Sequence, residues 1–169
     1  ECAKPWYNHS YFYYMGITSD NNLWATANGR GLRCSRDGGQ SWTTDTIGIN
    51  SEEMLNDICR LSDGTLFFFT LSCHLYKSTD GGHQWTSVPV PGYPLKLFVN
   101  ENDELILFSQ VNGITVYKST DKGENFVSVK SVPVSFYTMM DHTVHHRNGI
   151  YYLLIPGYGI LQTSDFDTY

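Results

Sequence analysis

Short apolar segments alternate with polar turns along the whole chain, and the apolar residues do not recur at the spacing of an amphipathic helix. The most apolar segments are Leu66–Phe69, Leu105–Phe108 and Tyr151–Ile155. Tyrosine and phenylalanine, which favour strands, supply 12 and 9 of the 169 residues. The pattern therefore predicts an all-β fold.

The turns divide the chain into four units, each of which we interpret as a run of short antiparallel strands. The units cover residues 11–46, 54–90, 95–130 and 136–169. Turns such as Ser62-Asp63-Gly64 have the composition of tight hairpins. The expected strands are, unit by unit, Tyr11–Thr18, Leu23–Ala27, Gly31–Cys34 and Ser41–Thr46; Met54–Leu61, Thr65–Leu71, His74–Lys77 and Gln84–Val90; Leu95–Asn100, Glu104–Ser109, Ile114–Lys118 and Asn125–Val129; and Phe136–Val144, Ile150–Ile155 and Gly159–Gln162.

A recurring motif marks the turn between the third and fourth strands of a unit. The segment Ser35–Trp42 is repeated as Ser78–Trp85 and Ser119–Phe126, with the shared pattern Ser-x-Asp-x-Gly-x-x-aromatic. A fainter copy begins at Thr163, so the starts lie 43, 41 and 44 residues apart. Four-stranded units at this period are typical of β-propeller blades, whose second strands are covered on both faces by neighbouring blades.

We therefore expect one domain, residues 1–169, that folds as a small β-propeller of four four-stranded antiparallel blades. The last unit lacks an outer strand, and residues 1–10, which include Trp6, are expected to supply it and close the ring. Closure would remove two exposed sheet edges. Two alternatives stay open: the chain is a fragment of a larger propeller, or it is a half-ring that completes itself as a homodimer.

Each part of the recurring motif has a structural role in a tight turn. The aspartate accepts hydrogen bonds from backbone N–H groups, the Ser hydroxyl bonds locally, the second glycine adopts a positive φ, and the aromatic residue packs against the next blade. We predict structural and not catalytic roles for the motif residues, which are Ser35, Asp37, Gly39, Trp42, Ser78, Asp80, Gly82, Trp85, Ser119, Asp121, Gly123, Phe126 and Asp165.

The motif resembles the Asp-box, or bacterial neuraminidase repeat, and the resemblance covers all four units. It implies a β-propeller related in architecture to sialidases, sortilin-type receptors, xyloglucan hydrolases and photosystem assembly factors. Because enzymes and non-enzymes share the Asp-box, it implies no activity. Sialidases also carry an Arg-Ile-Pro signature and bind the substrate carboxylate with three arginines from separate blades. This chain has no Arg-Ile-Pro, and three of its five arginines, Arg30, Arg33 and Arg36, fall in one unit.

Other candidate chemistry is weak. His142 and His145 lie three residues apart, so on a strand they would point to opposite faces. His146 would share a face with His142, but no third ligand is near in sequence. The chain has neither a Gly-x-Ser-x-Gly segment nor a phosphate-binding loop. We predict no catalytic residue, no metal and no cofactor.

Charge and cysteine content bear on partners and location. The net charge of −6 and the scattered lysines and arginines argue against a nucleic-acid partner. The most apolar run, Thr65–Leu71, is too short to span a membrane as a helix. The four cysteines, Cys2, Cys34, Cys59 and Cys73, favour an oxidising compartment, so we expect an extracellular or periplasmic protein with disulfides. Three pairings stay open, and buried free thiols are the alternative.

In such a fold the loops opposite the recurring turns are free for recognition. They combine acidic, basic and aromatic side chains, which suit a protein or glycan partner. The expected binding residues are Arg30, Glu52, Glu53, Tyr93, Phe136 and Tyr158. We expect a non-catalytic protein-binding module, of inhibitor, immunity or receptor type. A glycan-binding or glycoside-hydrolase-related propeller is the alternative, and a scaffold role within a longer multi-blade protein is a third hypothesis.

Overall fold

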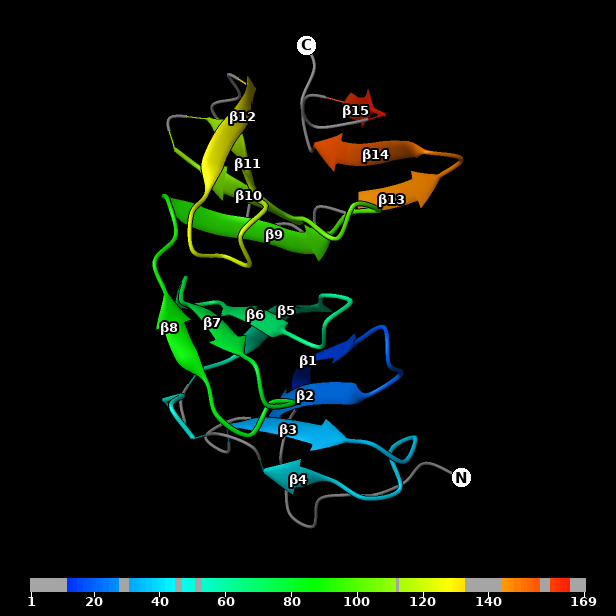
Figure 1. Cartoon of the computed structure of the whole chain (residues 1–169), viewed down its shortest axis with the longest axis vertical. Coiled ribbons are helices and arrows are strands. Elements are labelled where there is room, and N and C mark those ends of the chain that lie inside the picture. Colours follow the sequence, from blue (N-terminus) through cyan, green and yellow to red (C-terminus); the bar gives the residue numbers. More distant parts are fainter. Residues whose placement is uncertain are drawn as a thin grey trace.

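All regular secondary structure in the described residues is β-strand, as the sequence predicts (Figure 1). The structure is a computed structural model, and it describes residues 12–27, 31–44, 47–50, 53–111, 113–132, 144–155 and 159–164. Within these ranges the strands form four separate antiparallel sheets. In each sheet the strands follow one another in sequence order, so each is a meander of hairpins.

Sheets 1 and 2 correspond to the first two units. Sheet 1 contains β1 (Phe12–Ile17), β2 (Leu23–Ala27), β3 (Leu32–Ser35) and β4 (Thr43–Thr44). Sheet 2 contains β5 (Leu55–Arg60), β6 (Leu66–Thr70), β7 (Leu75–Ser78) and β8 (Thr86–Val88). The outer strands β4 and β8 are shorter than the sequence predicts, and residues 45–46 lie outside the described part of the chain.

Sheets 3 and 4 correspond to the last two units. Sheet 3 contains β9 (Tyr93–Val99), β10 (Leu105–Gln110), β11 (Ile114–Ser119) and β12 (Val127–Val132). Sheet 4 contains β13 (Val144–Arg147), β14 (Ile150–Ile155) and β15 (Gly159–Thr163). The expected strand Phe136–Val144 falls mostly outside the described residues. The described strand β13 instead runs from Val144 into the expected turn and pairs Arg147 with Ile150. Asn148 and Gly149 between them have φ values of 53° and 73°, as a two-residue hairpin requires.

The sheets stack face to face through three apolar cores, one at each junction between consecutive sheets. Trp24 and Leu32 of sheet 1 pack on Ile58 and Phe68 of sheet 2. The second core joins sheets 2 and 3 and includes Phe67, Phe69, Leu75, Leu105 and Leu107. The third joins sheets 3 and 4 through Ile106, Phe108, Ile114, Val116 and Tyr151. The all-buried strand β6 therefore lies between two cores, which explains its uninterrupted apolar sequence.

Sheets 1 and 4 lie at opposite ends of the long axis of the molecule (Figure 1). Met15 of β1 is 65% exposed and Ile160 of β15 is 69% exposed, although closure of sheet 4 onto sheet 1 would bury such side chains. The described residues therefore do not show the closed ring of four blades that the sequence suggests. The expected closing strand, residues 1–10, lies outside the described residues.

The cysteines within the described ranges form no disulfide. Cys34 is buried, and Cys59 and Cys73 are partly buried free thiols, whereas Cys2 lies outside the described part. The expectation of disulfides is therefore not met for these three residues. No helix able to cross a membrane occurs in the described ranges.

Candidate functional site

Three hydrogen bonds recur in the turns of each of the first three sheets. In sheet 2 the Asp80 carboxylate accepts from the backbone N–H groups of His83 and Gln84, both at 3.0 Å. The Ser78 hydroxyl donates to Asp80 at 2.8 Å and accepts from the Gly82 N–H at 3.0 Å. Ser35 and Asp37 make the matching contacts in sheet 1, as do Ser119 and Asp121 in sheet 3. Asp165 lies outside the described residues.

The aromatic residue and the second glycine of each turn take part in packing. Trp85 donates its indole N–H to the Gly82 carbonyl at 2.8 Å, and Trp42 does the same to Gly39 at 3.1 Å. Gly82 has a φ of +92°, and a Cβ added there would meet the Trp24 ring of sheet 1 at 2.2 Å. A Cβ added at Gly123 would likewise meet the Phe67 ring of sheet 2, at 2.8 Å. The turns therefore rest on the preceding sheet, and their aspartates have structural partners.

Of the six expected binding residues, Tyr93 and Glu53 lie within the described part of the chain. Tyr93 begins β9 and is 37% exposed, as a surface contact requires. A hydrogen bond with the Cys73 thiol, together with burial, raises the pKa of its hydroxyl. Arg30, Glu52, Phe136 and Tyr158 lie outside the described residues.

Glu53 is not the exposed recognition residue that the sequence suggests. It is 6% exposed, and its Oε1 forms a short contact with Nδ1 of His74, whose side chain is 56% exposed. Burial opposes ionisation of Glu53, but hydrogen bonds with Thr70 and His74 outweigh it and lower the pKa. Glu53 therefore turns inward against His74, which belongs to the turn between β6 and β7 and is the exposed member of the pair.

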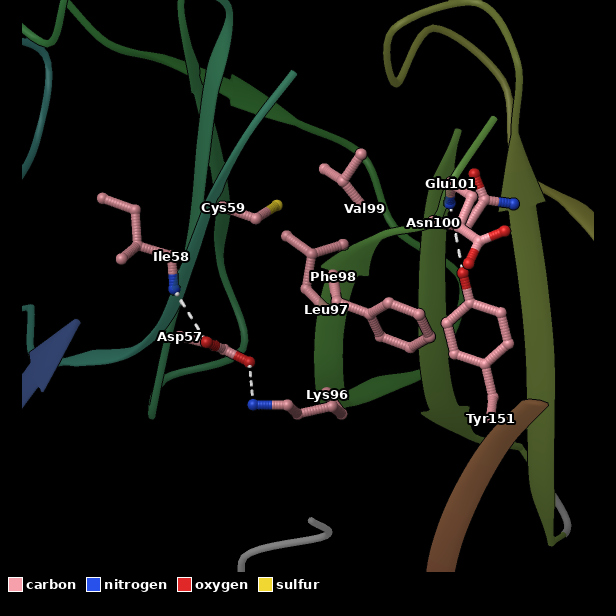
Figure 2. A pocket seen from close by; sticks show the side chains of 10 residues that line it. All are labelled: Asp57, Ile58, Cys59, Lys96, Leu97, Phe98, Val99, Asn100, Glu101 and Tyr151. Atoms are coloured by element: carbon pink, nitrogen blue, oxygen red, sulfur yellow. Dashed lines mark hydrogen bonds and ion pairs between the residues drawn. The ribbon is translucent and has the colours of Figure 1, made fainter. Parts of the chain in front are cut away.

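A hollow lies where sheets 2, 3 and 4 meet (Figure 2). Its volume is about 400 Å³. The walls come from the first strands β5 and β9, from the turn after β9, and from the start of β14. The lining residues are Asp57, Ile58, Cys59, Lys96, Leu97, Phe98, Val99, Asn100, Glu101 and Tyr151. We call this hollow the inter-sheet pocket.

An ion pair across two sheets forms one end of the inter-sheet pocket. Lys96 Nζ of β9 lies 2.5 Å from Asp57 Oδ2 of β5 (Figure 2). The two side chains are 31% and 19% exposed. Burial raises the pKa of Asp57, and the positive charge of Lys96 opposes that rise. Because an ammonium group has three donors, Lys96 keeps donors that a ligand can use.

Aromatic rings form the other end of the inter-sheet pocket. The Tyr151 ring packs against Phe98 with centroids 5.7 Å apart, and Phe98 stacks on Phe108 at 6.1 Å. The Tyr151 hydroxyl accepts a hydrogen bond from the Glu101 N–H at 3.1 Å, and burial raises its pKa. The pocket therefore offers a charged end and an apolar wall to one ligand group.

No group of three or more metal-ligating side chains occurs in the described ranges. Asp57 already has Lys96 as its counter-ion, and the second lining carboxylate, Glu101, lies in an exposed turn. Asn100 and Glu101 belong to the turn between β9 and β10, which emerges on the side of the recurring turns. The pocket is therefore not on the loop face that the sequence favours.

Sequence reasoning did not select Asp57, Lys96 or Tyr151. The available signal was the charged residue Lys96 inside the otherwise apolar first strand Tyr93–Val99, and Asp57 in the middle of the first strand Leu55–Arg60. That signal shows that the side chains need a partner, but not that the two face each other across a sheet junction.

One known protein family matches this chain over most of its length. The model of the DUF6242 beta propeller domain matches residues 5–162. The chain belongs to this family. Membership supports the β-propeller fold, and the four-stranded meanders are its blades. No curated protein matches the chain.

Solved structures of other propellers are similar to this DUF6242 chain. YCF48 from Cyanidioschyzon merolae has a TM-score of 0.68 at 16% identity, covering 94% of this chain and 54% of that one. YCF48 bound to D1 peptide has a TM-score of 0.63 at 17% identity, covering 94% and 56%. The GH74 enzyme of Niastella koreensis has a TM-score of 0.69 at 21% identity, covering 91% and 23%. The chain thus spans about half the length of the YCF48 chains. At these identities the similarity shows the fold alone.

Proposed function

We propose that this DUF6242 propeller is a non-catalytic module that binds a protein partner, with a partner side chain in the inter-sheet pocket. The observation that carries the proposal is the Asp57–Lys96 ion pair beside the Phe98–Tyr151 wall. A charged end orients a ligand, and an apolar wall supplies most of its affinity. Exposed Tyr93 and His74 lie on the opposite face, the loop face, where they would form a separate contact surface.

Two further observations support a protein as the ligand. The charge of −6 favours association with a basic partner surface. One structural neighbour, YCF48, was solved bound to D1 peptide, so a propeller of similar fold binds a peptide. An inhibitor, immunity or receptor-like role suits these properties.

The test uses a peptide library displayed against the purified chain. We expect selected peptides to bind at least tenfold more weakly to the double variant Asp57→Asn/Lys96→Gln, which removes both charges without leaving one unpaired. The matched control is Asp63→Asn/Lys122→Gln, because Lys122 Nζ and Asp63 Oδ2 form a 2.6 Å pair across the same two sheets outside the pocket. An equal loss of peptide binding in both double variants, or no loss of binding in either, would refute the proposed site.

A glycan ligand is the second candidate, because two carboxylates and two aromatic rings line the same pocket. Glycan sites commonly combine such groups, and glycosidases use carboxylate pairs. A glycan array with saturable binding that Tyr151→Ala abolishes, together with no peptide selected from the library, would favour this function.

Three further predictions belong with the proposal. The hydrogen-bonded Ser-x-Asp turns support our assignment of them as Asp-boxes.

An extracytoplasmic location stays a prediction, which fractionation of the native cells would test. A closing strand from residues 1–10 also stays a prediction. Deletion of these residues should then lower the unfolding temperature.

A further inference from the structure

Each of the first three sheets buries one cross-strand pair against the sheet that follows it. In each pair the third-strand residue lies three positions before the serine that begins the recurring turn. Its partner lies opposite it on the second strand. The buried pairs are Thr26–Leu32, Phe69–Leu75 and Phe108–Val116. Each of these side chains is at most 2% exposed. In sheet 4 this position is the pair Leu154–Ile160, which is 50% and 69% exposed.

The opposite end of the molecule shows the complementary feature. In β5 and β9, Ile58 and Leu97 pack against the preceding sheet and are 6% and 1% exposed. The same register position in β1 is Met15, which is 65% exposed. Ile17, two residues along the strand, is 60% exposed. Sheet 1 therefore exposes the face that, in sheets 2 and 3, packs against the preceding sheet.

We propose that a second copy of this chain covers both end faces, in a head-to-tail dimer. Leu154 and Ile160 of one copy would pack on Met15 and Ile17 of the other, which repeats between the copies the junction already made three times within each chain. Continuity with these junctions identifies the partner face as another sheet of the same type. The YCF48 chains, of which this chain spans 54% and 56%, are about the length of two copies.

The rotation between copies decides whether such an association stops at two. A head-to-tail contact forms a closed ring when the rotation between copies closes, and an open filament when it does not. In a closed dimer both junctions are identical, and all four apolar end faces are buried. Burial of aliphatic side chains is the driving force at each junction.

The test measures the mass of the purified chain by sedimentation over a wide range of concentrations. We expect twice the mass of one chain, and an unfolding temperature that rises with concentration. Ile160→Arg and Met15→Arg should each raise the dimer dissociation constant roughly a hundredfold, because each buries an unpaired charge at the junction. Val127→Arg is the matched control, because Val127 of β12 is 65% exposed but lies on an internal sheet.

Different results would overturn the proposal. A monomer at every concentration means that no second copy covers the faces. A dimer that Met15→Arg leaves intact is not head-to-tail, even if Ile160→Arg disrupts it. Since both residues are exposed in the single chain, an unchanged circular dichroism spectrum at low concentration separates lost association from lost folding.

Discussion

At the scale of single residues, the Ser and Asp of each recurring turn stabilise a backbone that would otherwise leave buried donors unpaired. The Ser78 hydroxyl accepts from the Gly82 N–H in a buried setting, and Ser78 itself is 2% exposed. The same bond occurs at Ser35 and Ser119. The serine is therefore as important to the turn as the aspartate that gives the motif its name.

Replacement of Ser78 tests this role. We expect Ser78→Ala to lower the free energy of unfolding by about 1 to 2 kcal/mol, because the Gly82 N–H loses its acceptor. Thr79→Ala, at the exposed next residue, should have little effect. Urea unfolding of both variants measures the difference. Equal stabilities of the two variants would show that the serine bond contributes nothing.

The turn aspartates predict a defined pH dependence of stability. Hydrogen bonds from Asn125 and Ser119 lower the pKa of Asp121 to about 2, and bonds from Ser41 and Ser35 do the same for Asp37. The ordinary value is 3.8. Because the folded pKa lies below the unfolded one, the stabilisation is complete above the unfolded value and is lost as the pH falls towards 2.

Asp121→Asn isolates this effect, because it removes the ionisable group at similar size. The unfolding temperature of the wild type should exceed that of the variant near neutral pH, and the difference should shrink as the pH falls from about 4 to about 2. Thermal unfolding across this range measures it. A difference that stays constant with pH would show that ionisation of Asp121 is not involved.

At the scale of elements, the recurring turn joins two sheets as well as two strands. Gly82 lies against Trp24 of the preceding sheet, and Gly123 lies against Phe67. These aromatic residues occupy the same position in β2 and β6, next to the strand residue that pairs with the turn serine. A glycine is required there because a side chain would displace the ring.

Two neighbouring glycines separate backbone strain from this packing. Gly81 and Gly82 have φ values of +75° and +92°, but only Gly82 has a ring within reach of an added Cβ. Gly82→Ala should lower the free energy of unfolding by about 2 kcal/mol or more, and Gly81→Ala by about 1. Chemical unfolding compares them. Equal losses would mean that contact with Trp24 adds nothing.

The sequence predicts the strands better than it predicts their contacts. The bounds of Leu23–Ala27 and Ile150–Ile155 match the structure, because apolar runs between strong turn signals are local properties. The Asp57–Lys96 pair joins residues far apart in the chain, and no local pattern shows that they meet. The burial of Glu53 also depends on a contact with another loop, which the sequence does not show.

At the scale of the whole molecule, the blades stack in series and the site arises where three of them meet. Sheet 2 supplies Asp57, sheet 3 supplies Lys96 and Phe98, and sheet 4 supplies Tyr151 (Figure 2). No single blade contains the inter-sheet pocket. A propeller of repeated sheets can therefore acquire a site by changing a few first-strand residues while its turns keep their structural role.

Hydrogen exchange of the chain, with and without a peptide selected from the library, tests the central claim most directly. We predict that the bound peptide slows exchange in β5 and β9, around Asp57 and Lys96, with a smaller effect near Tyr93. The variant Asp57→Asn/Lys96→Gln should lose the slowing in β5 and β9. Protection confined to the recurring turns or to β12, with β5 and β9 unchanged, would contradict the proposed site.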